Sequence, residues 1–346
     1  MKELVIFYFS GTGNARRVTE WFSDEGRLAG YNVTTINIAH HRMVPNPIPP
    51  QALIGFVSPT HGFNYPPLML HFLFRFPHSF FRNKVFLMNT RAGMKMGKFF
   101  LPGLSGVALL LAALILRIKG YRITGMRSVD LPSNWISLHP GLKQNVVTSI
   151  FGHCEGITRT FARTLLNGRK NFRALLDLPQ DLLITPIALG YYFIGRFVIA
   201  KTFVASRACN NCGLCIKQCP VNAISMVDNR PYWSYRCESC MKCMNNCPQR
   251  AIETAHGLLA VTILILNAVI FAAIYSWLPN KEVHISDSGL VNGTVEFTLQ
   301  SAVLFLVLTI TYRLAHYLKR FRWFDRLITY SSLTKYKFWR RYKAPG

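Results

Sequence analysis

The sequence predicts an α/β domain built on a parallel sheet of five strands, then a small α+β domain rich in cysteine, then two apolar helices long enough to span a membrane. Three observations lead to this fold class. Apolar strand patterns alternate with helix-sized segments over residues 1–165. Eight of the nine cysteines lie between Cys209 and Cys247. Two long apolar runs follow residue 256.

Five short apolar runs in the first 165 residues have the composition of β-strands. They are Leu4–Phe9, Asn32–Ile38, Ala52–Ser58, Lys84–Asn89 and Arg122–Val129. Segments of helical length separate them, which indicates a parallel sheet with helices on both faces. Ligands of such sheets bind at the carboxyl ends of the strands. The candidate binding loops therefore follow the first, third and fourth strands: Ser10-Gly11-Thr12-Gly13-Asn14, Ser58-Pro59-Thr60-His61-Gly62 and Asn89-Thr90-Arg91-Ala92-Gly93.

Phe99–Leu116 is an uncharged run of membrane-spanning length between the fourth and fifth strands. A crossing there would place the fifth strand on the other side of the membrane and leave sheet edges unpaired. We therefore expect a helix that covers the sheet. The same helix with its outer face dipped in lipid, and a true span, stay open as alternatives.

The composition excludes a disordered chain and does not fit an ordinary soluble domain, because 50% of the residues are apolar and only 16% are charged. The formal net charge is +25. Such a charge favours anionic lipid or an acidic partner. Nucleic acid is not expected as a partner, because no nucleic-acid-binding module accompanies the charge.

A basic and apolar connector, residues 166–205, leads to an internal repeat of 28 residues within 206–255. Each copy has the form C-x2-C-x2-C-x3-C-P, the pattern of bacterial proteins that hold two iron–sulfur clusters. Three close cysteines grip one cluster, and the fourth reaches the other. One set is then Cys209, Cys212, Cys215 and Cys247, and the second is Cys237, Cys240, Cys243 and Cys219. Zinc sites and disulfides are the alternatives. Zinc is disfavoured because zinc ribbons use longer spacers between their cysteine pairs. Disulfides are disfavoured because Met1-Lys2-Glu3 leads into a strand pattern rather than a secretory signal.

This segment resembles the bacterial ferredoxins with two [4Fe-4S] clusters. The resemblance implies low-potential transfer of one electron at a time. Cys154 lies outside the repeat and receives no role.

The first loop has the features of a phosphate cradle, with hydroxyls and backbone N–H groups at a helix N-terminus. The loop does not match the dinucleotide-binding fingerprint, because Arg16 stands in place of the third glycine. It does not match the Walker nucleotide-binding loop either, because the lysine of that pattern is missing. The loop resembles the flavodoxin phosphate loop at Ser10, Thr12 and Gly13. Ala15 replaces the last threonine of that pattern, and Asn14 is expected to compensate.

The second and third loops stand where flavodoxins flank the flavin ring, so the resemblance implies bound FMN. Phe63 or Tyr65 is expected either to stack on the ring or to pack in the core. His61 either hydrogen-bonds the flavin or is a structural loop residue.

Two segments near the C-terminus are candidates for membrane spans. Residues 257–278 carry no charge and cover about 33 Å as a helix. Residues 297–318 form a second candidate, whose uncharged run is shorter because it ends at Tyr312, before Arg313. The tail 319–346 mixes aromatic residues with nine Lys and Arg, and is expected to adhere to anionic lipid or to be solvated. The positive-inside rule then places both redox domains on the cytoplasmic side of the cytoplasmic membrane.

Together the two halves resemble flavodoxin–ferredoxin fusion proteins. The sequence thus predicts a membrane-anchored carrier that relays electrons between FMN, two [4Fe-4S] clusters and separate redox proteins. The alternative is a membrane flavin-dependent reductase, for example of a quinone. A scaffold without cofactors is disfavoured because all eight cysteines are present. No paired acid and base stand out, so catalytic residues are not assigned.

Overall fold

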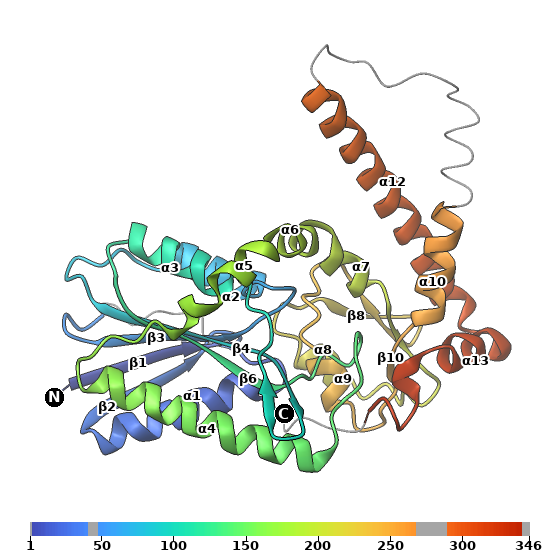
Figure 1. Cartoon of the computed structure of the whole chain (residues 1–346). Helices are drawn as coiled ribbons and strands as arrows, with labels where there is room; N and C mark the ends of the chain where they lie inside the picture. Colours follow the sequence, from blue (N-terminus) through green and yellow to red (C-terminus); the bar gives the residue numbers. More distant parts are fainter. Residues whose placement is uncertain (1, 41–47, 268–288, 341–346) are drawn as a thin grey trace.

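The computed structural model describes residues 2–40, 48–267 and 289–340 of the 346-residue chain. An α/β domain and a cysteine-rich domain lie side by side, and one long helix, α12, projects from the second (Figure 1). The domain order is the one that the sequence predicts.

The α/β domain is built on the expected sheet of five parallel strands. They are β1 (Lys2–Tyr8), β2 (Tyr31–Asn37), β3 (Leu53–Pro59), β4 (Lys84–Met96) and β6 (Arg122–Pro132). Their order in space is β2-β1-β3-β4-β6, with every pair parallel. This is the flavodoxin-like doubly wound order, in which the chain changes direction across the sheet between β1 and β3. A ligand is expected at the carboxyl ends of those two strands.

Two helices cover each face of the sheet (Figure 1). One face carries α1 (Asn14–Leu28) and α4 (Gln144–Leu166), and the other carries α2 (Pro67–Arg75) and α3 (Ala108–Ile118). Phenylalanines fill both layers. Phe22 of α1 stacks on Phe86 of β4, with ring centroids 4.1 Å apart, and Phe7 of β1 packs among the rings under α2. These two apolar layers fix the strand ends that carry the candidate site.

β4 is longer than predicted. The strand runs on to Met96 and pairs with β6 as far as Gly93 and Pro132. Asn89–Gly93, expected as a loop, is therefore strand. The chain then forms a short hairpin with β5 (Phe99–Leu101). The prediction of a helix over 99–116 is therefore wrong for its first residues. The covering helix itself is confirmed as α3, which begins at Ala108 and buries one side against the sheet.

The connector 166–205 is mostly helical. It contains η1 (Arg173–Asp177), α5 (Leu178–Leu183), α6 (Thr185–Gly190), η2 (Tyr191–Gly195), α7 (Arg196–Ala200) and β7 (Phe203–Ala205). Its last strand, β7, pairs antiparallel with β10 (Ile252–Thr254) at the end of the cysteine-rich domain. The connector thus becomes part of the second domain.

The two copies of the 28-residue repeat produce similar local structures. In each copy a short helix contains the third cysteine: α8 (Leu214–Lys217) contains Cys215 and α9 (Lys242–Asn246) contains Cys243. A hairpin of β8 (Ile224–Val227) and β9 (Arg230–Trp233) separates them. The resulting domain has a core around Trp233 and Phe203.

The predicted span 257–278 begins as α10 (His256–Ile265), and its part from 268 onward lies outside the described residues. The second predicted span, 297–318, falls within α12 (Gly289–Leu318), but the C-terminal part of this range packs on the cysteine-rich domain, where Tyr312 is 2% exposed and donates to the Phe203 carbonyl. In the described part of the chain, Val291–Leu318 is the one continuous helix with the length and hydropathy of a span, its mean hydropathy being 1.6. A bent pair, Arg173–Leu183 and Thr185–Ala200, would add a second if counted as one span.

The described part of the C-terminal tail folds back onto the cysteine-rich domain. It forms α13 (Arg322–Tyr330) and η4 (Leu333–Lys335). Lys319 is 1% exposed and donates to Asp325 at 2.5 Å, and Arg340 donates to Glu253. The tail up to residue 340 is thus folded, with Lys319 and Arg340 in ion pairs, whereas Arg320, Arg322, Arg326, Lys335 and Lys337 are exposed. Lipid adhesion and solvation of these exposed residues both stay predictions. Residues 341–346 lie outside the described residues.

Candidate functional site

A pocket lies at the carboxyl ends of β1 and β3, where the strand order changes direction. Ten of the fifteen predicted loop residues line it: Ser10, Gly11, Thr12, Asn14, Pro59, Thr60, His61, Thr90, Arg91 and Ala92. Gly13, Ser58, Gly62, Asn89 and Gly93 lie outside the lining. Further lining residues come from the turn after β6 and from the cysteine-rich domain: Ser133, Asn134, Trp135, His139, Ser239, Cys240 and Met241. Sequence reasoning predicted Cys240 as a cluster ligand and missed the other six.

The first loop leads into the N-terminus of α1 and is held by its own hydroxyl and by the turn after β6. Ser10 Oγ accepts from the N–H of Gly13, which has a φ of +98°. Thr12 Oγ1 accepts from the Asn134 amide at 2.9 Å. The Asn14 amide donates to the Pro132 carbonyl at 2.8 Å, so it anchors the loop. It does not replace the missing threonine hydroxyl as expected. The cradle therefore relies on the backbone N–H groups at the helix N-terminus.

Two aromatic rings face each other in the pocket. His61 and Trp135 have centroids 6.4 Å apart and rings inclined by only 21°. Burial lowers the pKa of His61 to about 4, so the imidazole is neutral at pH 7. Tyr65, one of the two predicted stacking residues, is fully buried in the core and donates to the Met88 carbonyl. Trp135 takes the place in the pocket that was expected for Phe63 or Tyr65.

The pocket also contains buried polar atoms that have no protein partner: His61 Nδ1, Asn134 Oδ1 and Trp135 Nε1. Buried polar groups are normally paired, and a bound ligand is one of the ways of pairing them. An aromatic pair, free ring nitrogens and amide oxygens, and a phosphate cradle suit a flavin mononucleotide. The residues present therefore fit FMN.

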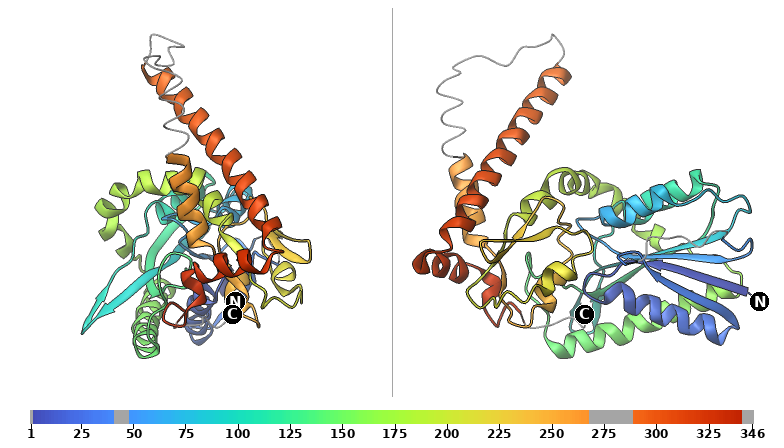
Figure 2. Two further views of the ribbon diagram at one scale, coloured as in Figure 1. Left: turned by 90° about the vertical axis from the view of Figure 1, so that its right-hand side faces the viewer. Right: turned by 180° about the vertical axis from the view of Figure 1, so that it is seen from behind.

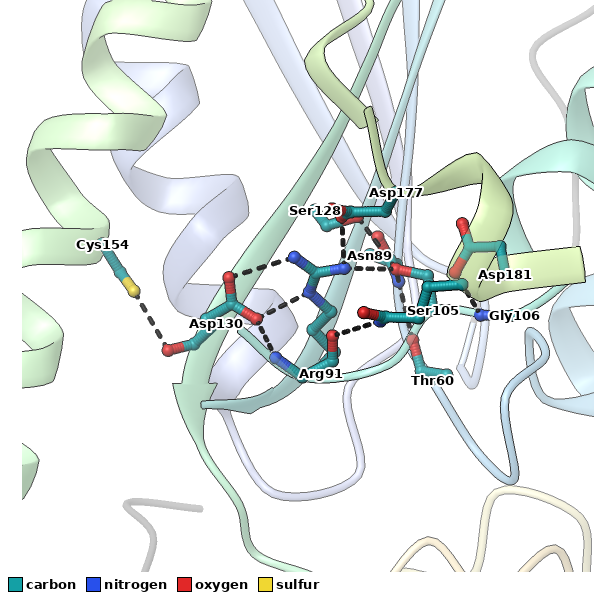
Figure 3. A network of polar contacts seen from close by, with 12 residues as sticks. Thr60, Asn89, Arg91, Ser105, Gly106, Ser128, Asp130, Cys154, Asp177 and Asp181 are labelled. Carbon is teal, nitrogen blue, oxygen red and sulfur yellow. Dashed lines mark hydrogen bonds and ion pairs between the residues drawn. The ribbon is translucent and has the colours of Figure 1, made fainter. Parts of the chain in front are cut away.

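Arg91 has a structural role at the edge of the pocket (Figure 3). Its side chain is 5% exposed and lies between Asp130 of β6 and Asp177 of η1, each with a closest contact of 2.6 Å. It also donates to Ser105 at 3.1 Å. Arg91 thereby ties the strand ends to the connector, because a buried guanidinium is stable only when carboxylates and acceptors surround it.

Cys154 lies on α4 beside the same network and donates its thiol to the Asp130 carbonyl at 3.2 Å (Figure 3). Burial raises the pKa of this thiol to about 12. A buried, protonated thiol is unreactive, which agrees with leaving Cys154 without a role.

The first predicted set of cysteines surrounds a common cavity in the cysteine-rich domain. Cys209, Cys212, Cys215 and Cys247 line it together with Cys243. Burial, with smaller contributions from the nearby Cys209 and Cys247, raises the pKa of the Cys215 thiol to about 11. Cys247 from the second copy of the repeat thus lies with three cysteines of the first, as the crossed assignment requires.

The second predicted set is more deeply placed. Burial raises the pKa of the Cys237 thiol, and the nearby Cys240 and Cys219 contribute to the same shift. The thiols of Cys219 and Cys247 accept from the N–H groups of Ala223 and Ala251, at 3.2 Å and 3.3 Å. Such N–H bonds stabilise cluster-bound thiolates and adjust cluster potentials. Among the described residues, no three Cys, His, Asp or Glu side chains are placed to hold a single metal ion, so the cluster assignment depends on the cysteine pattern.

The flavin-type pocket and the second cysteine set meet at one loop. Ser239, Cys240 and Met241 form a wall of the pocket. The backbone of Gly11 lies so close to this loop that an added Cβ would stand 2.4 Å from the Cys240 carbonyl oxygen. Glu238 accepts from the Leu68 N–H at the start of α2 at 3.1 Å, which holds the loop in place. A predicted cluster ligand and the phosphate loop are therefore in direct contact within one chain.

Comparison with known proteins agrees with the division of the chain into an α/β domain and a cysteine-rich domain. Residues 208–252 match the family described as the 4Fe-4S dicluster domain. The comparison with curated proteins finds no significant match.

The solved structures similar to this chain resemble its first half. A flavodoxin from the domain Archaea is 12% identical and covers 47% of this chain and 97% of its own, with a TM-score of 0.28. The two-electron reduced flavodoxin of Megasphaera elsdenii is 15% identical and covers 46% and 98%, with a TM-score of 0.27. An azoreductase from Bacillus anthracis str. Sterne is 11% identical and covers 46% and 100%, with a TM-score of 0.32. The fold assignment rests on the strand order rather than on these scores.

A flavodoxin-like domain followed by a 4Fe-4S dicluster domain defines the class of this chain as an electron-transfer protein.

Proposed function

We propose that this chain is a membrane-anchored electron-transfer protein that holds one FMN and two [4Fe-4S] clusters and exchanges single electrons with separate redox proteins. The observation that carries the proposal is the shared wall of the pocket, where the loop with Cys240 adjoins the phosphate loop at Gly11. A flavin exchanges one or two electrons, and each cluster exchanges one. A protein that holds both can therefore transfer electrons between a partner that exchanges two at a time and a partner that exchanges one.

The residues of the α/β domain bind and orient the flavin. Backbone N–H groups of Gly11, Thr12 and Asn14, which line the pocket, hold its phosphate at the positive end of α1. His61 and Trp135 flank the ring position, and their free nitrogens supply hydrogen bonds. Because His61 is neutral at pH 7, it places no positive charge beside the ring.

The eight cysteines hold the clusters in the crossed arrangement. Cys237, Cys240, Cys243 and Cys219 bind the cluster beside the flavin pocket. Cys209, Cys212, Cys215 and Cys247 bind the cluster farther from it. Cys212 is exposed at this outer site, which makes the outer cluster the natural point of contact for a redox protein.

The exposed apolar helix α12 supports membrane anchoring. We place both redox domains on the cytoplasmic side, because the short predicted loop 279–296 carries few basic residues and the C-terminal tail carries many. The net charge of +25 suits acidic redox partners and an anionic lipid surface.

Cofactor content of anaerobically purified, detergent-solubilised protein tests the proposal. We expect about one FMN and about eight irons and eight sulfides per chain, with cluster signals in electron paramagnetic resonance. Iron without flavin would remove the flavin half of the proposal, and zinc in place of iron would overturn the redox function. Protein that oxidises NADH or NADPH without a partner would favour a reductase over a carrier.

A further inference from the structure

The connector has an unusual amphipathic arrangement between Arg173 and Ala200. On most surface helices the apolar side faces the protein and the polar side faces water. Here the carboxylates point inward. Asp177 pairs with Arg91 at 2.6 Å, and Asp181 accepts from the Gly106 N–H at 2.8 Å (Figure 3). Both partners belong to the α/β domain.

The apolar side chains of the same segment point outward. Leu176 is 79% exposed and Leu183 is 83% exposed, and Leu182, Ile187 and Phe193 are also largely exposed. An apolar surface of this kind on successive helical turns marks a site of contact with a membrane or a partner.

The helices that carry these side chains lie on one side of the molecule. α3, α5 and α6 lie along the side of the body from which α12 rises (Figures 1 and 2). Phe197 of α7 packs against Phe305 of α12, with ring centroids 5.6 Å apart. From Gly289 to Phe305, α12 extends for about 24 Å, most of the roughly 30 Å thickness of a bilayer core. The connector is thus at the level where α12 would leave the membrane.

A cationic cavity continues the surface toward the other end of the α/β domain. It has a volume of about 740 Å³, and four basic side chains line it: Arg82, Arg117, Arg122 and Lys170. No acidic side chain lies among its lining residues. Phe80, which is 92% exposed, and Ile118 of α3 lie next to this lining in the sequence. Basic groups beside exposed apolar side chains match the surface of an anionic bilayer, where phosphates lie above acyl chains.

We propose that this face, formed by the connector helices, the outer side of α3 and the cationic cavity, lies in the plane of an anionic lipid bilayer. The connector does not cross the membrane, because Asp177 and Asp181 fasten it to the α/β domain. The face holds the α/β domain against the membrane while α12 anchors the cysteine-rich domain. This inference rests on the proposed membrane anchoring and adds a second, in-plane contact to it.

Photochemical labelling from lipid tests the two contacts separately. Full-length protein with its cofactors is placed in vesicles of phosphatidylglycerol and phosphatidylcholine that contain a photoactivatable phospholipid, and modified peptides are mapped by mass spectrometry. We expect lipid adducts in α12, in residues 174–193 and in residues 79–83. Adducts in α12 alone would overturn the in-plane contact and leave the anchoring intact. Absence of adducts from α12 as well would overturn both.

Two variants sharpen the test. In Leu176→Glu/Leu183→Glu we expect several-fold fewer adducts in 174–193, with unchanged adducts in α12 and unchanged FMN and iron content. The control is Leu28→Glu on α1, where the leucine is 79% exposed on the opposite face of the sheet; it should change nothing. Unchanged labelling of 174–193 in the double variant would overturn the proposal.

Lipid charge tests the cationic cavity. In vesicles of phosphatidylcholine alone, and in the variant Arg82→Gln/Arg117→Gln, we expect several-fold fewer adducts in residues 79–83. Labelling there that depends neither on lipid charge nor on these arginines would contradict an anionic-lipid contact.

Discussion

Substitution of Gly11 tests whether the phosphate loop of the α/β domain and the Cys240 loop of the cysteine-rich domain are in direct contact. In Gly11→Ala, the new methyl group would stand 2.4 Å from the Cys240 carbonyl oxygen. Real Cβ atoms keep a distance of at least 3.0 Å, so one of the two loops must move by about 0.6 Å or more. Overpacking of this kind costs about 1–3 kcal/mol. If the phosphate loop moves, the dissociation constant of FMN rises by roughly 5- to 150-fold.

FMN binding is measured by titrating flavin-free protein and following the quenching of flavin fluorescence. Electron paramagnetic resonance of the reduced clusters reports the other possibility, a displacement of the Cys240 loop. The matched control is Gly156→Ala on α4, where nothing lies within 4 Å of the added methyl group. Unchanged FMN affinity together with unchanged cluster spectra in Gly11→Ala would refute the close contact on which the proposed function depends.

Three further predictions concern buried ionisable side chains of the α/β domain. Arg91→Met should lower the free energy of unfolding by about 3–5 kcal/mol, because it leaves Asp130 and Asp177 without their partner; urea unfolding followed by circular dichroism measures it, and a loss as small as that of the exposed control Arg27→Met would contradict the role of Arg91. The pKa of His61, about 4, is below its ordinary value, so the folded state binds fewer protons than the unfolded state between pH 4 and 6.5. The free energy of unfolding should therefore fall by up to about 3 kcal/mol as the pH drops through this range, and an equal pH dependence in His61→Gln would show that another group is responsible. Hydrogen bonds from Arg163, and then from Arg159, hold the pKa of Glu25 below its ordinary value against the opposing effect of burial. Glu25→Gln should cost about 1–2 kcal/mol at pH 7 and progressively less as acid protonates the wild-type carboxylate, so a constant difference down to acidic pH would exclude this pair as the source.

The five parallel strands could be predicted in outline because they are apolar and separated by helix-length segments. The exact ends could not. Asn89–Gly93 contains Arg91 and Gly93, which suggest a loop, yet β4 continues through it because Asp130 and Asp177 neutralise Arg91 and β6 supplies a partner as far as Gly93. Long-range ion pairs of this kind leave no local signal.

Only the part of the candidate site that follows predicted strands could be predicted from the sequence. The three loops stand after predicted strands, and most of their residues line the pocket. Trp135 follows the last strand, where a sequence pattern does not separate a pocket residue from a packing residue. Ser239 and Met241 are about 230 residues from Ser10, and only the docking of the second domain brings them to the pocket.

The sequence by itself determined the class of chemistry, because cysteine spacing and the phosphate-loop pattern are local features that a ligand requires directly. It also determined the parallel sheet, because period and segment length are local properties of the chain. Only the tertiary structure decided which domain surfaces meet, which basic residues are buried in ion pairs and which side of the connector is apolar. Those outcomes depend on contacts between residues far apart in sequence. Lys319 and Leu183 illustrate this: the charged side chain is buried and the apolar one is exposed, the reverse of what their residue types alone suggest.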